Sequence, residues 1–277
     1  MPVIALTQGM GSLAQDIAEQ LAKELQLSTL QHEVTERVAS KMHVSKSLIS
    51  RLRAGRAGPI ERLTADRASI EVYSAEEVLE AAARGHVVLR GWGATCLLRP
   101  VAHVPCVRIL RPLAKRVQWL MAEVDTDDAE LAEAEIRRSD NANASRMQEQ
   151  FGVNWGEPVL FDLVLNTDRL SVDTCVGQIK ALVARPEFVP TASSRAMLQA
   201  MALQARVRSA LRANNATHDV DITIDTTALG VRLRGIVLNA VERSAVEQVA
   251  AAVSGVGDVD NQLRLMTNSR QFSASKT

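Results

Sequence analysis

A glycine-bearing turn near the beginning of the chain is the stretch best suited to bind a phosphate group. The turn, residues 9–12 (GMGS), follows a short apolar run at residues 3–6 and precedes apolar residues at helical spacing over residues 13–25. Ser12 is a suitable N-cap for this helix, and Asp16 suits the positive end of its dipole. A strand, a glycine turn and a helix N-terminus together present free backbone N–H groups, which bind phosphate.

The turn departs from the standard phosphate-binding P-loop, which has the form G-x-x-x-x-G-K-[ST]. Counted from Gly9, the second glycine falls on Ala14, the lysine on Gln15 and the hydroxyl residue on Asp16. Spacing alone therefore leaves two interpretations open, a phosphate site and a plain strand-to-helix turn. The candidate phosphate-binding residues are Gly9, Gly11, Ser12, Leu13, Ala14 and Gln15.

A basic segment follows this first unit. Residues 32–54 are expected to be helical and to end before Gly55 and Gly58. Its basic residues and those just beyond it are Lys41, Lys46, Arg51, Arg53, Arg56 and Arg62. They fit either an anion-facing segment over the turn or a solvated helix face.

The composition is that of a folded protein without a strong charge preference. The 277 residues are 47% hydrophobic, 23% charged and 3% aromatic, and two domains are the natural expectation at this length. The formal net charge is zero, so we expect no nucleic-acid partner. Three scattered cysteines lack metal-ligand spacing, so no metal site is expected. With no export signal at the start and no apolar stretch of membrane-spanning length, we expect a cytoplasmic protein without a transmembrane segment.

Strands and helices alternate over residues 1–184, the first predicted domain. Strands are predicted at residues 3–6, 86–90, 104–110 and 161–166, and helices at 13–25, 32–54, 75–84, 114–124, 129–138 and 172–184. The strands are almost continuously apolar, which indicates an α/β fold with a parallel sheet and helices on both faces. Ligands of such sheets bind at the carboxyl ends of the strands, where the turns after Leu6 and Arg90 fall.

The rest of the chain has a different pattern. Residues 185–196 contain two prolines and read as a linker. Beyond it we predict helices at residues 197–212 and 242–253, and strands that alternate polar with apolar residues at 219–225, 229–237 and 259–266. Residues 197–267 therefore form a small α+β domain, and residues 268–277 a polar tail.

The first domain resembles the cytidylate kinase-like family of P-loop nucleoside monophosphate kinases. Residues 15–18 (QDIA) follow the turn as in the family, and residues 87–94 (VVLRGWGA) stand where it has a strand followed by Gly-Arg-Gly-Ala. Residues 103–108 (HVPCVR) are similar to its His-Val-Arg strand, and residues 161–171 (FDLVLNTDRLS) to its final strand and turn. The segment with Arg137, Arg138, Asp140 and Arg146 matches its lid.

Three departures from the family fall on the residues that handle phosphate. Its two loop glycines are Leu13 and Ala14 here, and the basic residue after them is Gln15. The arginine of its Gly-Arg-Gly turn, which contacts the acceptor phosphate in related kinases, is Trp92. Because phosphoryl transfer depends on positioning and on cations, losing two of them puts catalysis in doubt while leaving the fold intact.

The resemblance implies an enzyme that transfers a phosphoryl group from ATP with Mg²⁺ to a nucleoside monophosphate. The loop from Gly9 to Gln15 would hold the ATP phosphates, Arg108 and Arg116 would border them, and Asp140 would orient an arginine. Arg137, Arg138 and Arg146 would close as a lid. The departures favour instead a domain that binds nucleotide weakly, with degraded or absent transfer, or a purely structural one. A further alternative pairs the arginines with Glu130, Glu133 and Glu135 on helix faces.

The second domain resembles a BON domain over about residues 203–267. The similar positions are residues 230–235 (GVRLRG) on the hairpin, and residues 254–256 (SGV) and 259–261 (VDN) before the last strand. This resemblance implies a module without chemistry that binds a phospholipid surface or a protein partner.

Overall fold

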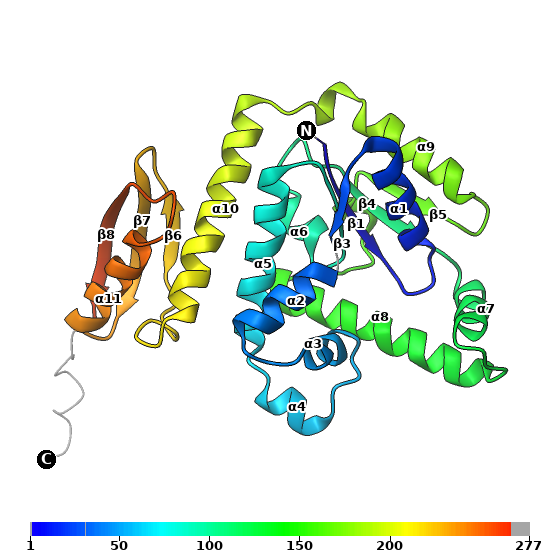
Figure 1. Ribbon diagram of the computed structural model, residues 1–277, viewed down its shortest axis with the longest axis horizontal. Helices are drawn as coiled ribbons and strands as arrows, with labels where there is room; N and C mark the ends of the chain where they lie inside the picture. Colours follow the sequence, from blue (N-terminus) through cyan, green and yellow to red (C-terminus); the bar gives the residue numbers. More distant parts are fainter. Residues whose placement is uncertain (1, 31, 267–277) are drawn as a thin grey trace, which may run out of the picture. The chain divides into compact units, whose positions relative to one another are not determined.

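A five-stranded parallel sheet organises the N-terminal part of the computed structural model, which describes residues 2–30 and 32–266 (Figure 1). Its order is β2-β3-β1-β4-β5, and every neighbouring pair is parallel, as the apolar strands predict. The strands are β1 (Val3–Gln8), β2 (Ser28–Leu30), β3 (Val87–Arg90), β4 (Cys106–Leu110) and β5 (Leu163–Asn166). Val3, Ile4, Ala5 and Leu6 are at most 2% exposed, which explains why β1 lies at the centre.

Helices cover both faces of this sheet, which confirms the α/β expectation. One face packs against α1 (Ala14–Leu25) and α9 (Val172–Val183), which share a core with apolar residues of β1, β3, β4 and β5. Contacts of α6 (Ala94–Leu98) with β1 and β4, and of α5 (Arg67–Arg84) with β3 and α6, cover the other face. Within residues 2–30 and 32–266, none of the helices combines the length and apolar character needed to cross a lipid bilayer.

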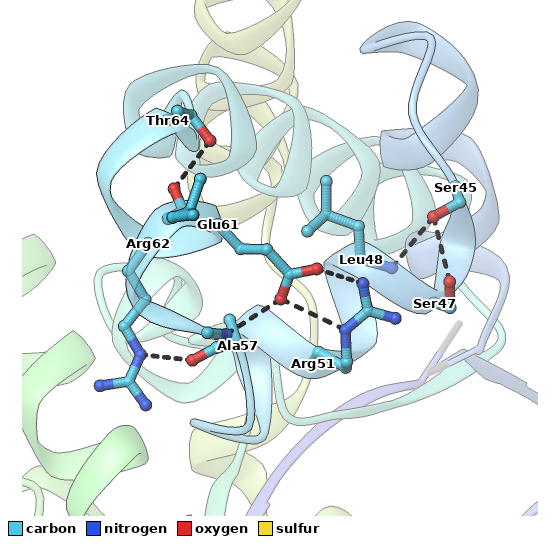
Figure 2. Close-up of polar contacts among 10 residues, drawn as sticks. Ser45, Ser47, Leu48, Arg51, Ala57, Glu61, Arg62 and Thr64 are labelled. Carbon is cyan, nitrogen blue, oxygen red and sulfur yellow. Dashed lines mark hydrogen bonds and ion pairs between the residues drawn. The ribbon is translucent and has the colours of Figure 1, made fainter.

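The remaining helices of this part differ from the expectation in extent, and α4, like α6, has no counterpart in the prediction. They are α2 (His32–Lys41), α3 (Lys46–Arg53), α4 (Pro59–Thr64), α7 (Leu113–Glu123) and α8 (Ala129–Phe151). The single helix expected over residues 32–54 is two, because His43 has a φ of +55° and Ser45 caps a new start by accepting from the Leu48 N–H (Figure 2).

Two helices are longer than predicted, and one strand has no counterpart in the prediction. The α8 helix continues past Arg138 because residues 139–151 contain no glycine or proline, and it ends at Gly152, whose φ is +66°. The α5 helix begins at Arg67, eight residues before the expected start, because Asp66 caps it by accepting from the Ser69 N–H. The strand β2 has three residues, none of them buried, so it leaves no apolar pattern in the sequence.

The segment expected as a linker begins the next helix early. After a 3-10 turn at Pro186–Phe188, α10 runs over Ala192–Ala213, and the division into two compact units falls within it, after Gln199. Thr191 and Ser194 explain the early start, because each hydroxyl accepts from the backbone N–H of the other residue. The Ser194 hydroxyl also lies 2.8 Å from Nδ1 of the buried His103, within the N-terminal unit.

The C-terminal unit is a small mixed sheet with helices on one face. Its strands are β6 (Thr223–Thr226), β7 (Gly230–Val237) and β8 (Asp258–Leu265); β6 and β7 are antiparallel, β7 and β8 parallel. The later part of α10 and α11 (Ala240–Ala251) pack on the buried Val231 and Leu233. Arg232, between them, pairs with Asp260 at 2.6 Å on the polar face. The predicted α+β domain is confirmed, while the predicted tail, residues 268–277, lies outside the described residues.

Gly230 provides a test of how closely β7 and β8 approach. A Cβ at this position would lie 2.0 Å from the Asp258 carbonyl oxygen, so Gly230→Ala should lower the free energy of unfolding of the C-terminal unit by about 2 kcal/mol or more. The control is Gly177→Ala in α9, where a Cβ meets nothing within 4 Å; helix propensity should stabilise it by about 0.5–1 kcal/mol. Urea denaturation measures both. Equal stability of Gly230→Ala and wild type would contradict the β7–β8 register.

Candidate functional site

The loop between β1 and α1, residues 9–13, lies at the edge of the sheet where ligands of such folds bind. After β1 the chain continues to β2, at one edge of the sheet, and after β4 it continues to β5, at the other edge. The carboxyl ends of β1 and β4, which are neighbours, therefore flank a point where the strand order reverses, and crevices form at such points. We call residues 9–13 the β1–α1 loop.

Three side chains hold the carbonyl groups of the β1–α1 loop. Arg116 Nε donates to the Met10 carbonyl at 2.6 Å, Arg111 to Gly11 at 3.3 Å and Thr167 Oγ1 to Ser12 at 3.0 Å. In each peptide unit the N–H points away from the carbonyl, so the N–H groups that follow these carbonyls face the opposite side of the loop. Those of Gly11 and Leu13 donate to no other backbone group in the described ranges.

The two glycines of the loop allow α7 to approach from the carbonyl side. A Cβ on Gly9 would lie 2.9 Å from an Arg116 guanidinium nitrogen, and one on Gly11 would lie 2.8 Å from the Trp119 ring. Gly11 also has a φ of +77°, which glycine adopts without strain. Leu13 adopts the same left-handed region at +60°, an unfavourable conformation for a residue with a Cβ, immediately before α1.

An ion pair fixes the position of Arg116. Its guanidinium donates two hydrogen bonds to the Asp140 carboxylate, at 2.8 and 2.7 Å. The Arg116 side chain is 11% exposed and that of Asp140 29%. Two parallel hydrogen bonds fix the orientation of the guanidinium group as well as its distance from the carboxylate. Asp140 on α8 therefore holds Arg116 of α7 in the position from which it supports the loop.

A cavity of about 370 Å³ opens on the loop. The loop lines it together with the β3 turn, and three arginines, Arg53, Arg90 and Arg146, contribute to its walls. Ser12 is only 2% exposed, and its hydroxyl oxygen, at the N-terminal end of α1, has no hydrogen-bond partner among the residues that the structure describes. A buried hydroxyl without a partner is costly, so this cavity favours a ligand that accepts or donates at that point.

The structure brings some of the predicted site residues together and separates others. Gly9, Gly11, Ser12, Leu13, Ala14, Gln15 and Arg146 line the cavity. Arg116 and Asp140 lie on the carbonyl side of the loop. Arg108 lies over the rings of Trp155, at 4.6 Å, and Phe161, at 5.3 Å, and donates to the Trp155 carbonyl.

The two remaining arginines of the predicted lid line a second, larger cavity. Both are paired with glutamates of α8. Arg137 contacts Glu133 at 2.7 Å, and Arg138 contacts Glu135. Arg137 thus forms the pair that i,i+4 spacing allows, and both arginines would have to leave these partners to reach a phosphate in the cavity of the loop.

Sequence reasoning missed several residues that line the cavity of the loop. Arg90 ends the strand before the second glycine turn, so its place at the same sheet edge was readable from the strand pattern. Burial lowers the pKa of Arg90, opposed by the charges of Glu19 and Asp16. Trp119 and Trp155 carried no local signal. Trp155 Nε1 donates to Thr7 Oγ1 at 3.0 Å, across nearly 150 residues of chain.

The described residues offer neither a metal cluster nor a reactive thiol. No group of three or more His, Cys, Asp or Glu side chains among them could hold a metal ion. Burial and the nearby Asp162 raise the pKa of the Cys106 thiol to about 12, so almost no thiolate is present near neutral pH. The groups that line this edge include backbone N–H groups, the Ser12 hydroxyl and arginines.

Known protein families match both units of the chain. Residues 3–169, more than half of the chain, match the Cytidylate kinase-like family. The chain belongs to this family. Residues 200–267 match the BON domain, so the two compact units correspond to the kinase-like and BON regions expected from the sequence.

The individual relatives share little sequence identity with this chain. A cytidylate kinase of Staphylothermus marinus is 27% identical over 123 residues, 44% of this chain and 68% of that protein. The crystal structure of an uncharacterized protein from Eubacterium ventriosum covers 67% of this chain and 100% of its own, with a TM-score of 0.53 and 16% identity. Shikimate kinase from Bacteroides thetaiotaomicron covers 66% and 99%, with a TM-score of 0.42 and 13% identity.

Replacing Asp140 tests the support of the loop. Asp140→Asn would leave the nearly buried Arg116 cation without its anion, so we expect the free energy of unfolding to fall by about 2 kcal/mol, less than for a fully buried pair. The control on the same helix is Glu133→Gln, whose partner Arg137 is 60% exposed; its cost should stay below about 0.5 kcal/mol. Chemical denaturation measures both. Equal costs would show that the Arg116–Asp140 pair does not support the fold.

Proposed function

We propose that the kinase-like unit binds a nucleotide through its phosphates at the β1–α1 loop, with phosphoryl transfer degraded or absent. The observation that carries this proposal is the Ser12 hydroxyl, which is buried at the N-terminal end of α1 and has no hydrogen-bond partner in the described ranges 2–30 and 32–266. A phosphate oxygen is an acceptor for this hydroxyl and for the N–H groups of Gly11 and Leu13. The positive end of the helix dipole favours the same charge.

The charges around the cavity support an anionic ligand. Arg53, Arg90 and Arg146 line it, whereas Asp16 is its acidic lining residue. Family membership supports a nucleotide as the molecule that carries the phosphates, and ATP with Mg²⁺ is the form we propose. Because much of the attraction is electrostatic, affinity should be weak and should fall with rising salt.

Degraded transfer follows from the residues at the two positions where the family has cations. Gln15 donates its amide to Glu19 at 2.9 Å and has no charge to stabilise a transferring phosphoryl group. Trp92 occupies the second position. One cation in such a site can contribute several powers of ten in rate, so binding can persist where transfer does not.

An active CMP-type kinase is the second candidate. Two observations favour it: one of the relatives is a cytidylate kinase, and arginines line the cavity although Gln15 and Trp92 replace the cations of the family. In that reading Arg137, Arg138 and Arg146 close over the phosphates, and Asp140 orients Arg116.

For the BON unit we propose a protein or phospholipid surface as partner, and for the whole chain a cytoplasmic location.

Binding is tested by titration calorimetry of the full chain with ATP and Mg²⁺, CTP or CMP at low salt. We expect dissociation constants in the millimolar range or below, weakened by added salt. Ser12→Ala should weaken ATP binding about tenfold, the effect of one hydrogen bond to a charged group. It should not lower the melting temperature, since the hydroxyl has no hydrogen-bond partner in the described part of the chain. If none of the nucleotides gives heat at millimolar concentration, the proposal is wrong.

Catalysis is tested separately by a coupled assay with ATP and CMP. We expect turnover to be absent or far below about 10 per second, an ordinary enzyme value. Gln15→Lys alone should not restore it, because Leu13 and Ala14, where the family has glycines, keep their side chains at the end of the loop and the start of α1. Wild-type turnover near that value would establish the active kinase instead.

A further inference from the structure

The strand β8 of the BON unit has one edge that pairs with no other strand in the described part of the chain. The order β6-β7-β8 places it at an outer position of its sheet, as Figure 1 shows, and its backbone pairs with β7 alone. It has eight residues, whereas β6, at the opposite edge, has four. It contains neither proline nor lysine, which commonly prevent a second strand from pairing with such an edge.

Hydrogen bonds at the two ends of β8 show which of its residues face this outer edge. The N–H groups of Asp258 and Met266 donate to the carbonyls of Leu229 and Val237, at 2.9 and 2.8 Å. Backbone groups alternate from side to side along a strand, so the even-numbered residues of β8 face β7. The N–H and C=O groups of residues 259, 261, 263 and 265 consequently face outward.

Side chains of the same unit occupy part of the outer edge. The Val259 N–H donates to the Asp258 carboxylate at 3.0 Å, and the Leu263 N–H donates to the Asn261 side-chain oxygen at 3.1 Å. The Asn261 carbonyl accepts from Arg243 at 3.3 Å. Local bonds of this kind compete with strand pairing, so a strand that pairs here must displace them and should bind reversibly.

The polar face of β8 carries two opposite charges. Asp260 and Arg264 lie on this face together, because side chains alternate along a strand and the two are four residues apart. Asp260 pairs with Arg232 of β7 at 2.6 Å and accepts from Gln262 at 2.9 Å. Arg264 is exposed, and within the described ranges it belongs to no ion pair.

These charges make β8 complementary to a second copy of itself. If two copies of the strand lie antiparallel with Gln262 opposite Gln262, Asp260 of each copy lies opposite Arg264 of the other. Opposite charges that face each other across paired strands stabilise the pair. The arginine that lacks a carboxylate in its own unit thus meets one in the second copy, on both sides of the axis.

The backbone and the apolar side chains fit the same register. It places Val259 opposite Leu265 and Asn261 opposite Leu263, and all four have outward-facing N–H and C=O groups. These are the residues that must exchange hydrogen bonds in an antiparallel ladder, whereas Gln262 takes a position without such bonds. Leu265 is 42% exposed, and Val259 of the second copy would cover part of it.

We propose that β8 pairs antiparallel with β8 of a second copy of this chain and joins the two three-stranded sheets into one of six strands. Each contact then occurs twice about the two-fold axis at Gln262. Because the contact is narrow, we expect a dissociation constant of roughly tens to hundreds of micromolar. The inference rests on the proposed function only in taking a protein as the partner of the BON unit.

The first test is sedimentation velocity of the full chain from micromolar to millimolar concentration. The wild type should change reversibly from monomer to dimer. Arg264→Glu sets two acidic residues against each other and should weaken the dimer at least tenfold. Arg208→Glu makes the same charge change at an exposed position of α10 and should alter association less than threefold. A wild type that stays monomeric, or equal effects of the two variants, would overturn the proposal.

A charge exchange between two chains tests the register. Asp260→Arg alone should also weaken the dimer, since it sets Arg264 against a second cation. An equimolar mixture of Asp260→Arg and Arg264→Glu should recover a dimer with one chain of each, because opposite charges then face each other at both places. Absence of recovery, with both variants folded, would contradict the register. If Asp260→Arg does not fold after losing Arg232, cross-linking decides.

Cross-linking uses single cysteines on β8 in a Cys96→Ser background. Residues opposite each other without ladder hydrogen bonds have Cα atoms about 4.5 Å apart, a separation that a disulfide can span. Gln262→Cys should therefore give a covalent dimer on mild oxidation. Asp258→Cys, also exposed, would lie about 26 Å from its copy and should not. Equal yields from the two variants would show that the chains do not pair in this way.

The outcome is separable from that of the proposed function. The variants of β8 should leave ATP binding at the β1–α1 loop unchanged. If the chain stays monomeric but sediments with vesicles of phosphatidylcholine and phosphatidylglycerol, this inference is wrong and the BON unit has a phospholipid partner. If the dimer forms as described but ATP, CTP and CMP do not bind, the inference holds and the nucleotide proposal fails.

Discussion

The support of three carbonyl groups in the β1–α1 loop is the constraint on which the site depends. Arg116, Arg111 and Thr167 each donate to one of these carbonyls from a different element: α7, the end of β4 and the end of β5. The N–H groups of the same peptides consequently face the other way. A parallel sheet brings the ends of β1, β4 and β5 to one edge, so the fold itself places the donors where the loop needs them.

The groups that bind a phosphate differ from those that transfer it. The loop offers backbone N–H groups and a buried hydroxyl, which belong to the fold and survive the replacement of individual cations. Transfer of a phosphoryl group needs cations at defined places as well, and Gln15 and Trp92 supply none there. Among the cations that line the cavity of the loop, Arg53 comes from α3, Arg90 from the end of β3 and Arg146 from α8, so their geometry differs from that of a charged loop.

Apolar patterning predicted the sheet well, because continuous apolar strands such as β1 and β3 can be buried only on both faces. It missed β2, whose exposed residues leave no pattern, and the break at His43, which depends on one backbone angle. Motif spacing pointed to the loop, and the resemblance to the family pointed to Arg146, which lines the cavity of the loop. Spacing could not show that Arg116 supports the loop from its carbonyl side or that Arg53 stacks on Trp92, because both contacts join residues far apart in sequence.

The central claim, that the N–H groups of the β1–α1 loop face a phosphate site, is tested most directly by amide NMR. The full chain, labelled with ²H and ¹⁵N, would be titrated with pyrophosphate at low salt, with the Gly230 amide of the BON unit as internal control. The account predicts that the amide resonances of Gly11, Leu13 and Ala14 shift in a saturable manner while that of Gly230 does not. Unchanged loop amides with saturable shifts elsewhere would contradict it.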